Sequence, residues 1–268
     1  MSALHKIKNA FNKSKASYDL HSGLQSHVGD QLIQLLLAVF HKQNLPRIID
    51  LGCGTGTNTQ KLLDKIPVRE LHAIDIADDL LKIAQQRLQG KNVHVYAHAF
   101  DQPFTVDNAF DIAYSNMALH WSVSFDKTIQ SLHSQLNKHG IIVFSVPLTG
   151  TLSELQPHFS VNSMAQAAEV TQILNQTGFD VLAEQSEVVT LRFPDTLAAL
   201  RSLKQVGANT SHTVRDNRLS GKSLLRAVNI QQLTYNIGYF IARKTEHPCH
   251  ANYTLPAQTQ ALEKPISA

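Results

Sequence analysis

Cysteine is scarce in this chain, and no hydrophobic run is long enough to cross a membrane. The two cysteines, Cys53 and Cys249, lie far apart and match no metal-ligand spacing. Residues 1–19 lack the apolar core of a signal peptide, and the longest apolar stretch is interrupted by Gln34. These absences exclude a disulfide framework and a membrane span, and they predict a reduced, cytoplasmic protein.

Histidine is plentiful, but its pattern does not indicate a metal centre. The fourteen histidines are scattered along the chain and show neither an HExxH motif nor paired Cys/His spacing. We therefore expect no metal site. With 268 residues, of which 43% are hydrophobic and 17% are charged, the chain is long enough for one large domain or for one domain with a cap.

Short apolar runs alternate with amphipathic segments between residues 46 and 147. Helices are predicted at 57–66 and 78–89, where apolar residues recur at helical spacing. The intervening runs are apolar and rich in β-branched residues, as expected of strands buried in a parallel sheet. We predict an α/β fold with a doubly wound parallel sheet, with strands at 47–52, 70–77, 93–99, 109–116 and 141–148.

The remainder of the chain falls into three segments around this 46–147 core. Residues 1–45 are predicted to be helical, and residues 148–244 are predicted to form a cap together with the last strands. The elements expected in the cap are helices at 164–179 and 196–207 and strands at 188–193 and 233–244. Residues 245–268 are polar and interrupted by proline, so we expect a disordered tail.

Three glycines follow the first predicted strand in the stretch DLGCGTGT, which begins at Asp50. In open parallel sheets, ligands bind beyond the carboxyl ends of the strands, where the strand order reverses. Dinucleotide sites use a GxGxxG spacing, whereas Gly52, Gly54 and Gly56 follow the pattern GxGxG. Asp50 would repel a pyrophosphate but attract a cationic amino acid group, and Asp75 supplies an acid for a ribose diol. The combination favours S-adenosylmethionine over a nicotinamide dinucleotide.

The stretches DLGCGTGT and AIDIA resemble the first two motifs of the class I S-adenosylmethionine-dependent methyltransferases. This resemblance implies that Asp50 and Gly52 hold the methionine end of the cofactor and that Asp75 binds the ribose hydroxyls. The end of the third strand normally carries an acid for the adenine amino group, and here either His98 or Asp101 fills that position, with Asp101 preferred. The cofactor-binding residues implied are Asp50, Gly52, Gly54, Gly56, Asp75, Ile76, Asp101 and Asn116.

Four further stretches resemble the malonyl-[acyl-carrier protein] O-methyltransferases of biotin synthesis, namely SYDLHSGLQSHV, SNMALHW, GTLSEL and RSLKQVGA. The resemblance runs from about Tyr18 to Arg243, and RSLKQVGA is its most discriminating part. It implies methyl transfer from S-adenosylmethionine to the free carboxylate of malonyl-acyl carrier protein. The resulting methyl ester primes pimeloyl and biotin synthesis. Because a carboxylic acid of ordinary pKa is ionised at neutral pH, no general base is expected.

Five residues are candidates for the acceptor side of the site. Arg201 is expected to bind the carboxylate, and Lys204, one helical turn on, to share that face or to serve the phosphopantetheine of the carrier. Tyr18 is expected to close over the methyl donor or to hydrogen-bond the substrate, and His120 and Trp121 follow the fourth strand. Structural alternatives stay open: a solvated charge for Arg201, packing for Tyr18 and Trp121, and a satisfied, partly buried histidine for His120.

Basic residues gather in two parts of the chain. The stretch from Arg201 to Val228 holds six basic residues against the single acid Asp216, and residues 1–18 carry four lysines and no acid. This asymmetry predicts docking of an acidic acyl carrier protein, the alternative being a solvated surface with unbalanced charge. Nucleic acid is disfavoured because aromatic residues do not interleave with the basic ones. Two other functions stay open: a methyltransferase of another small carboxylate or phenol, and a non-catalytic S-adenosylmethionine-binding protein.

Overall fold

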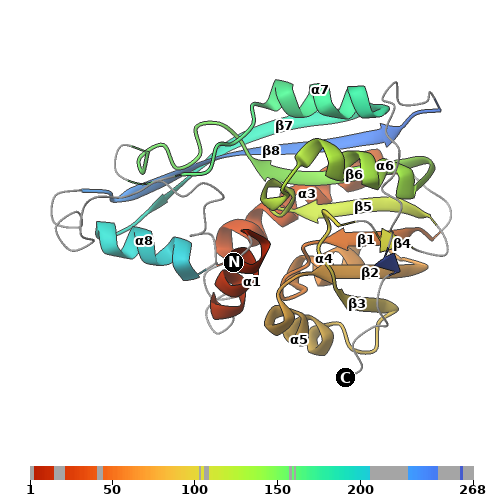
Figure 1. Ribbon diagram of the computed structural model, residues 1–268, viewed down its shortest axis with the longest axis horizontal. Helices are drawn as coiled ribbons and strands as arrows, with labels where there is room; N and C mark the ends of the chain where they lie inside the picture. The colour runs from red at the N-terminus through yellow and green to blue at the C-terminus, as the bar shows by residue number, and fades with distance from the viewer. Residues whose placement is uncertain are drawn as a thin grey trace.

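The protein is built on a mixed β-sheet of seven strands. In this computed structural model the strands follow the order β3-β2-β1-β5-β6-β8-β7 across the sheet (Figure 1). Their bounds are β1 Arg47–Leu51, β2 Glu70–Asp75, β3 Val93–Ala97, β5 Phe110–Asn116, β6 Leu136–Pro147, β7 Phe179–Arg192 and β8 Gln232–Lys244. The structure describes residues 3–14, 22–40, 45–102, 104–105, 109–156, 159, 161–205, 229–246 and 260–261.

Five neighbouring strands, from β3 to β6 in the sheet order, are parallel, and every residue of β1 is buried. The chain moves outward from β1 to β2 and β3 and then returns to β5 on the other side of β1. Strand order therefore reverses between β1 and β5, which places a ligand crevice at the carboxyl ends of these two strands. The predicted doubly wound α/β fold is confirmed, and β8 and β7 extend the sheet in antiparallel orientation.

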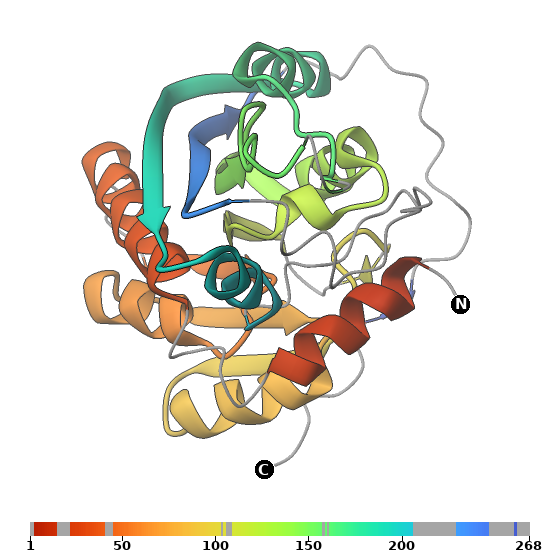
Figure 2. The same ribbon diagram turned by 90° about the vertical axis from the view of Figure 1, so that its left-hand side faces the viewer.

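Helices cover both faces of the sheet (Figures 1 and 2). On one face lie α3 (Gly23–Val39), α4 (Thr57–Lys65) and α5 (Asp78–Arg87), and on the other lie α6 (Phe125–Gln135) and α7 (Ala167–Thr177). The helix α3 is amphipathic because Leu24, Val28, Leu32 and Leu36 recur every fourth residue, and all four are buried against the sheet. Each face of the sheet thus has an apolar core of its own.

A third, smaller apolar cluster lies under the cap. The helix α8 (Thr196–Gln205) places Ala199 and Leu203 against Leu233 of β8 and Leu155 of the segment after β6. The N-terminal helix α1 (Ala3–Ser14) contacts both α8 and α5. Figures 1 and 2 show α1 and α8 on the side of the molecule toward which the parallel strands point. The cap therefore borders the crevice rather than the opposite end of the sheet.

Several elements differ from the sequence expectation. The strand β7 begins at Phe179 rather than at Val188, because a bulge between Val181 and Ala183 and exposed polar residues on this edge strand hide the alternation. The helix α6 and the short 3₁₀-helix η1 (Leu119–Trp121) were not predicted. Residues 260–261, within the tail for which we expect disorder, form β9 and pair with β4 (Phe104–Thr105).

No helix in the described part of the chain combines the length and the apolar character needed to cross a bilayer.

We expect Leu32→Ala to lower the free energy of unfolding by about 2–5 kcal/mol, since it leaves a cavity where α3 meets the sheet. Gln31→Ala, which changes an exposed position one residue earlier on the same helix, is the control and should change this free energy by less than about 0.5 kcal/mol. Urea denaturation followed by circular dichroism measures both values. Equal effects of the two substitutions would contradict the placement of α3.

Candidate active site

The glycine loop between β1 and α4 is made of bare backbone at the crevice. Gly52 has φ +77°, and a Cβ at this position would lie 2.4 Å from the Cβ of Ala118, so a larger residue is excluded both by conformation and by space. The amides of Gly52 and Cys53 donate to the carbonyl of Ile74 at 2.8 and 3.0 Å. The loop is thereby fastened to the end of β2, and its backbone forms one wall of the site.

A buried carboxylate, that of Asp50, and a half-buried one, that of Asp75, flank this loop. The hydroxyl of Thr59 donates to Oδ2 of Asp50 at 2.5 Å, while the carboxylate of Asp75 accepts the amides of Gly54 at 2.9 Å and Ala77 at 2.8 Å. Burial raises the pKa of Asp50 to about 7, although the Thr59 bond opposes this shift, and the charge of Asp75 adds to it. Burial also raises the pKa of Asp75 above its ordinary value.

The charge of these acids is not neutralised within the site. Among the residues that the structure describes, neither Asp50 nor Asp75 forms a salt bridge, and the hydrogen bonds found to their carboxylates come from a hydroxyl and from backbone amides. Two carboxylates held close together in a buried site favour the entry of a positively charged ligand group. The loop therefore selects against anions such as pyrophosphate.

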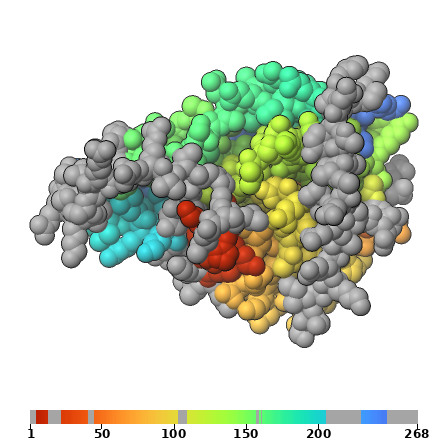
Figure 3. Space-filling view, in the orientation of Figure 1, coloured from red at the N-terminus to blue at the C-terminus, as the bar shows by residue number. Residues whose placement is uncertain are grey.

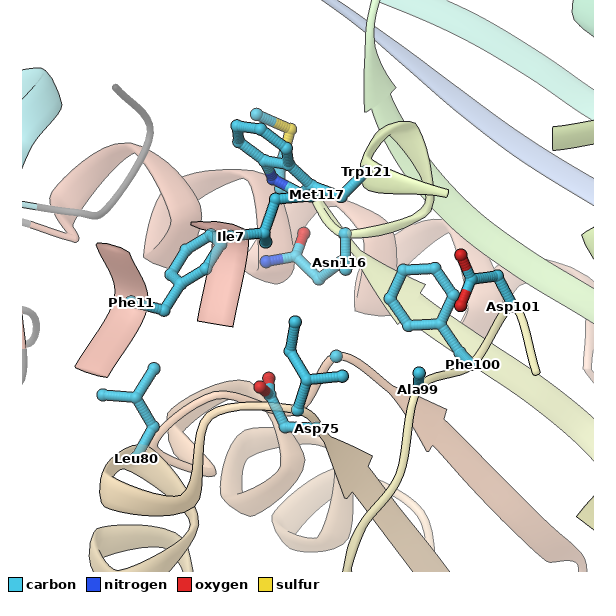
Figure 4. Close-up of a pocket in the computed structure, with 13 residues that line it drawn as sticks. Ile7, Phe11, Asp75, Leu80, Ala99, Phe100, Asp101, Asn116, Met117 and Trp121 are labelled. Atoms are coloured by element: carbon cyan, nitrogen blue, oxygen red, sulfur yellow. The ribbon is translucent and has the colours of Figure 1, made fainter. Parts of the chain in front are cut away.

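The crevice has two lobes that meet at Gly52 and Asn116. One lobe is largely apolar and has an empty volume of about 600 Å³, and the other is polar and has an empty volume of about 430 Å³. Side chains from Ile7, Phe11, Ile76, Leu80, Ala99 and Phe100 line the apolar lobe together with Asp75 and Asp101. Figure 4 shows Asp75 and Asn116 on opposite sides of this lobe, with Phe11 at one end and Phe100 at the other.

The polar lobe is lined by hydroxyl and amide side chains around Asp50. The amides of Asn116 and Asn58 donate to the backbone carbonyl of Gln25 at 2.8 and 3.3 Å, which joins α3 to the ends of the strands. Oε1 of Gln25 and Oδ1 of Asn58 are buried and have no hydrogen-bond partner among the described residues. Neither oxygen has exposed surface, and Oδ1 of Asn58 lies against Gly29 of α3, so both atoms are enclosed within the protein rather than facing the open lobe.

The helix α1 covers the apolar lobe. Phe11 packs edge-on against Trp121 with ring centroids 5.8 Å apart, and Lys8 forms an ion pair with Asp78 at 2.7 Å. Oδ1 of Asn12 also accepts the amide of Asp79 at the start of α5, at 3.1 Å. In the space-filling view α1, in red, lies next to α8, in cyan (Figure 3). Four residues that line the lobes were not predicted from the sequence: Ile7, Phe11, Gln25 and Asn58.

Most of the expected cofactor residues meet at this crevice. Gly52, Asp75, Ile76, Asp101 and Asn116 line the apolar lobe, and Asp50 lines the polar one. Gly54 and Gly56 belong to the loop itself, and Gly56 precedes α4 with φ +76°. Between the two candidates at the end of β3, Asp101 lines the lobe and His98 is not among the lining residues.

The expected acceptor residues are more dispersed. Trp121 lines the apolar lobe, and His120 packs on the Trp121 ring with centroids 4.9 Å apart. Arg201 and Lys204 are exposed on α8 and line neither lobe, although α8 contacts α1, which does. Tyr18 and residues 206–228 lie outside the described part of the chain.

Solved structures share this fold, and a family model gives the class of protein. A Bacillus halodurans protein assigned as a methyltransferase superposes with a TM-score of 0.58 at 14% identity, covering 80% of this chain and 98% of its own. The YcgJ protein of Bacillus subtilis superposes with a TM-score of 0.59 at 12% identity, covering 81% and 100%. The fold and the glycine loop at its switch point are those of a class I methyltransferase, and the family model described as "Methyltransferase domain" matches residues 42–218.

Sequence relatives define the family more narrowly. The chain is 33% identical over 240 residues to malonyl-[acyl-carrier protein] O-methyltransferase 2 of Coxiella burnetii, covering 89% of this chain and 96% of that protein. It is 28% identical to the malonyl-[acyl-carrier protein] O-methyltransferase of Nitrosospira multiformis, covering 81% and 78%. A third relative, at 29% identity, is the biotin biosynthesis bifunctional protein BioHC of Teredinibacter turnerae, covering 82% and 41%. This chain belongs to the malonyl-[acyl-carrier protein] O-methyltransferase family.

We expect Gly52→Ala to destabilise the fold more than Gly90→Ala does. Both positions have a positive φ, which costs an alanine about 1–2 kcal/mol, but only at Gly52 would the new Cβ meet another atom within 4 Å. The clash with Ala118 should add about 1–3 kcal/mol to the loss in free energy of unfolding. The double variant Gly52→Ala/Ala118→Gly should recover this added part alone. Urea denaturation tests the set, and equal losses at Gly52 and Gly90 would contradict the close contact.

Proposed function

We propose that this methyltransferase uses S-adenosylmethionine to methylate the free carboxylate of malonyl-acyl carrier protein. The observation that supports this choice of cofactor is that a polar, acidic lobe and an apolar lobe meet at Gly52 and Asn116. S-adenosylmethionine has the matching character, with a charged amino acid at one end and an aromatic base at the other. When bound, it supplies an electrophilic methyl group on a sulfonium sulfur.

The polar lobe suits the amino acid end. Asp50 lines this lobe and offers a negative charge to an ammonium group, and the serine and threonine side chains that line the same lobe carry hydroxyl oxygens that can accept its hydrogens. In the absence of a cation, Asp50 retains a proton up to about pH 7 because it is buried. A bound ammonium would favour the ionised carboxylate, so cofactor binding is coupled to the loss of this proton.

The apolar lobe suits the nucleoside. Asp75 lines this lobe while its carboxylate is fixed by the amides of Gly54 and Ala77, which leaves it placed to accept hydrogen bonds from two ribose hydroxyls. Asp101 lines the same lobe, and its Oδ2 accepts the amide of Val123 at 3.3 Å. Phe100 and Leu80 provide apolar walls for a base, and Phe11 closes the lobe from α1.

The acceptor assignment rests on the relatives named as malonyl-[acyl-carrier protein] O-methyltransferases and on the charge of the cap. Arg201 and Lys204 stand one helical turn apart on the exposed part of α8, beside α1. A guanidinium pairs with a carboxylate through two parallel hydrogen bonds, so Arg201 is our candidate for holding the malonyl carboxylate. Trp121 and His120 follow β5 and form the wall of the lobe next to Phe11.

The reaction requires no general base from the protein. A malonyl carboxylate is ionised at neutral pH and is itself the nucleophile, so no side chain has to remove a proton. The contribution of the chain is to orient the carboxylate and to exclude water from it. The apolar walls given by Trp121, Phe11 and Met117 lower the solvation of the carboxylate, which makes it more reactive toward the methyl group.

The carrier protein is the proposed partner. Acyl carrier proteins are acidic, and four basic or histidine side chains are exposed on α1, which covers the apolar lobe, and on α8, which contacts α1: Lys6, His5, Arg201 and Lys204. The basic residues between 206 and 228 belong to the same segment but lie outside the described residues. Docking by this charge would place a flexible thioester arm at the edge of the lobe, and it should weaken as salt rises.

We expect the purified protein to add one methyl group to malonyl-acyl carrier protein when S-adenosylmethionine is supplied. Acetyl-acyl carrier protein, which lacks the free carboxylate, should stay unchanged, and intact-protein mass spectrometry distinguishes the two results. Methylation of free malonate, another small carboxylate or a phenol, with the carrier form inert, would assign a different acceptor. Cofactor binding with no turnover of any acceptor would instead identify a binding protein.

Arg201→Ala should reduce kcat/KM for malonyl-acyl carrier protein by about 10-fold to 100-fold, because it removes a charged hydrogen-bonding group worth about 1.5–3 kcal/mol. Binding of S-adenosylmethionine, measured by calorimetry, should not change. Arg192→Ala removes another exposed arginine of the cap and serves as the matched control. If Arg192→Ala lowers kcat/KM as much as Arg201→Ala does, Arg201 acts only through overall charge.

The affinity for S-adenosylmethionine should fall as the pH falls below about 7. The raised pKa of Asp50 means that the free protein binds a proton there, and this proton must leave when a cation enters. The dissociation constant should therefore rise by up to about tenfold for each pH unit below about 7. Calorimetry in buffers of different ionisation enthalpy measures the proton released on binding.

Two variants test whether Asp50 causes this dependence. Asp50→Asn should bind more weakly at neutral pH and lose the proton release, since the amide does not titrate. Asp64→Asn, which changes an exposed carboxylate on α4, should keep the dependence of the parent protein. If the affinity of Asp50→Asn for S-adenosylmethionine still falls below about pH 7, the titrating group is not Asp50.

A further inference from the structure

A second group of chemically reactive side chains lies at the opposite end of the sheet from the candidate active site. Glu70 and His72 occupy the first and third positions of β2, and His94 lies directly across from His72 on β3. Nε2 of His72 is 3.4 Å and Nε2 of His94 is 3.9 Å from the same oxygen of Glu70. One ligand atom from each of the three residues lies within 4.8 Å of the others.

The surroundings hold two of these side chains in place. Arg47 pairs with the other oxygen of Glu70 and donates to the carbonyl of Ala109 at 3.0 Å, so the remaining oxygen of Glu70 points toward the histidines. The ring of His72 is buried and stacks on Tyr96 at an interplanar angle of 8°, with centroids 5.6 Å apart. Both arrangements fix a ligand before any ion arrives, which reduces the entropy lost on binding.

The exposure of the group suits a metal ion. The side chains of His94 and Glu70 are 39% and 24% exposed, so an ion and its water molecules can reach them. Two imidazoles and one carboxylate, with water in the fourth position, form a known tetrahedral ligand set for zinc.

We propose that Glu70, His72 and His94 bind one zinc ion. With zinc–ligand bonds of about 2.0–2.2 Å, tetrahedral geometry separates ligand atoms by about 3.3 Å. The separation between His72 and Glu70, 3.4 Å, is close to this value, and the half-buried ring of His94, at 3.9 Å, would have to move closer by about half an ångström. The ion would join β3, which is the edge strand of the sheet, to β2 through side chains. The site is independent of the methyltransferase reaction.

The test is zinc binding by tag-free full-length protein. Competition with a chromogenic chelator should give one equivalent of zinc bound at micromolar or lower concentration, and saturating zinc should raise Tm by several degrees. Cobalt added in place of zinc should give the intense visible absorption of a tetrahedral site. Failure to bind zinc in the micromolar range would overturn the proposal.

Variants locate the ion. His94→Gln removes a ligand from a partly exposed position and should weaken binding by at least about tenfold and abolish the rise in Tm. Glu70→Gln should weaken zinc binding in the same way. Agreement between the two variants would show that the loss does not come from a structural change caused by His94→Gln alone. His139→Asn changes an exposed histidine beside Glu246, at a left-handed position that asparagine tolerates, and should leave zinc binding unchanged. Zinc binding that is unaffected in both ligand variants would place the ion elsewhere and refute the proposed site.

Discussion

The structure depends on two carboxylates held away from bulk water at the ends of neighbouring parallel strands. Asp50 lies next to the last residue of β1 and Asp75 is the last residue of β2. Removal from water raises the pKa of both groups, and the charge of Asp75 raises the pKa of Asp50 further. The protein meets the cost of ionising them with one hydroxyl, from Thr59, and with backbone amides from the loops that follow the strands. The remaining imbalance is what makes the crevice receptive to a cation.

This constraint explains why the loop is made of glycine. Amides reach Asp75 only if the chain turns back tightly after β1, and Gly52 makes that turn while lying against Ala118. The same turn leaves a surface without side chains, on which the two lobes of the crevice meet. Charge burial, backbone conformation and the shape of the site are therefore consequences of one short stretch of sequence.

The local parts of this arrangement could be predicted from the sequence. The five parallel strands and the glycine loop are contiguous segments whose apolar runs and spacing identify them, and several residues predicted to bind the cofactor line the crevice at their ends. The strand β7 was predicted too short because its bulge breaks the period of two. The helix α6 was missed, although Ile129 and Leu132 are its buried positions, because its sequence is mostly polar.

The non-local parts could not be predicted. Gln25 and Phe11 reach the site only because α3 and α1 are folded over the ends of the strands, which no spacing in the sequence reveals. His72 and His94 are 22 positions apart in number and become neighbours through the pairing of β2 with β3. Arg201 is a candidate because of the resemblance to malonyl-[acyl-carrier protein] O-methyltransferases. Its exposed position on α8 suits contact with a large partner better than contact with a ligand inside the lobes.

The attachment of α1 separates the stability of the fold from the retention of ligands. Ile7 and Phe11 close the apolar lobe, yet neither belongs to the two large apolar cores on the faces of the sheet. Sequence change in the first helix can therefore alter how long a ligand stays bound while the sheet and its cores are preserved. In evolutionary terms, residence time and folding are free to vary independently in this protein, because different segments of the chain encode them.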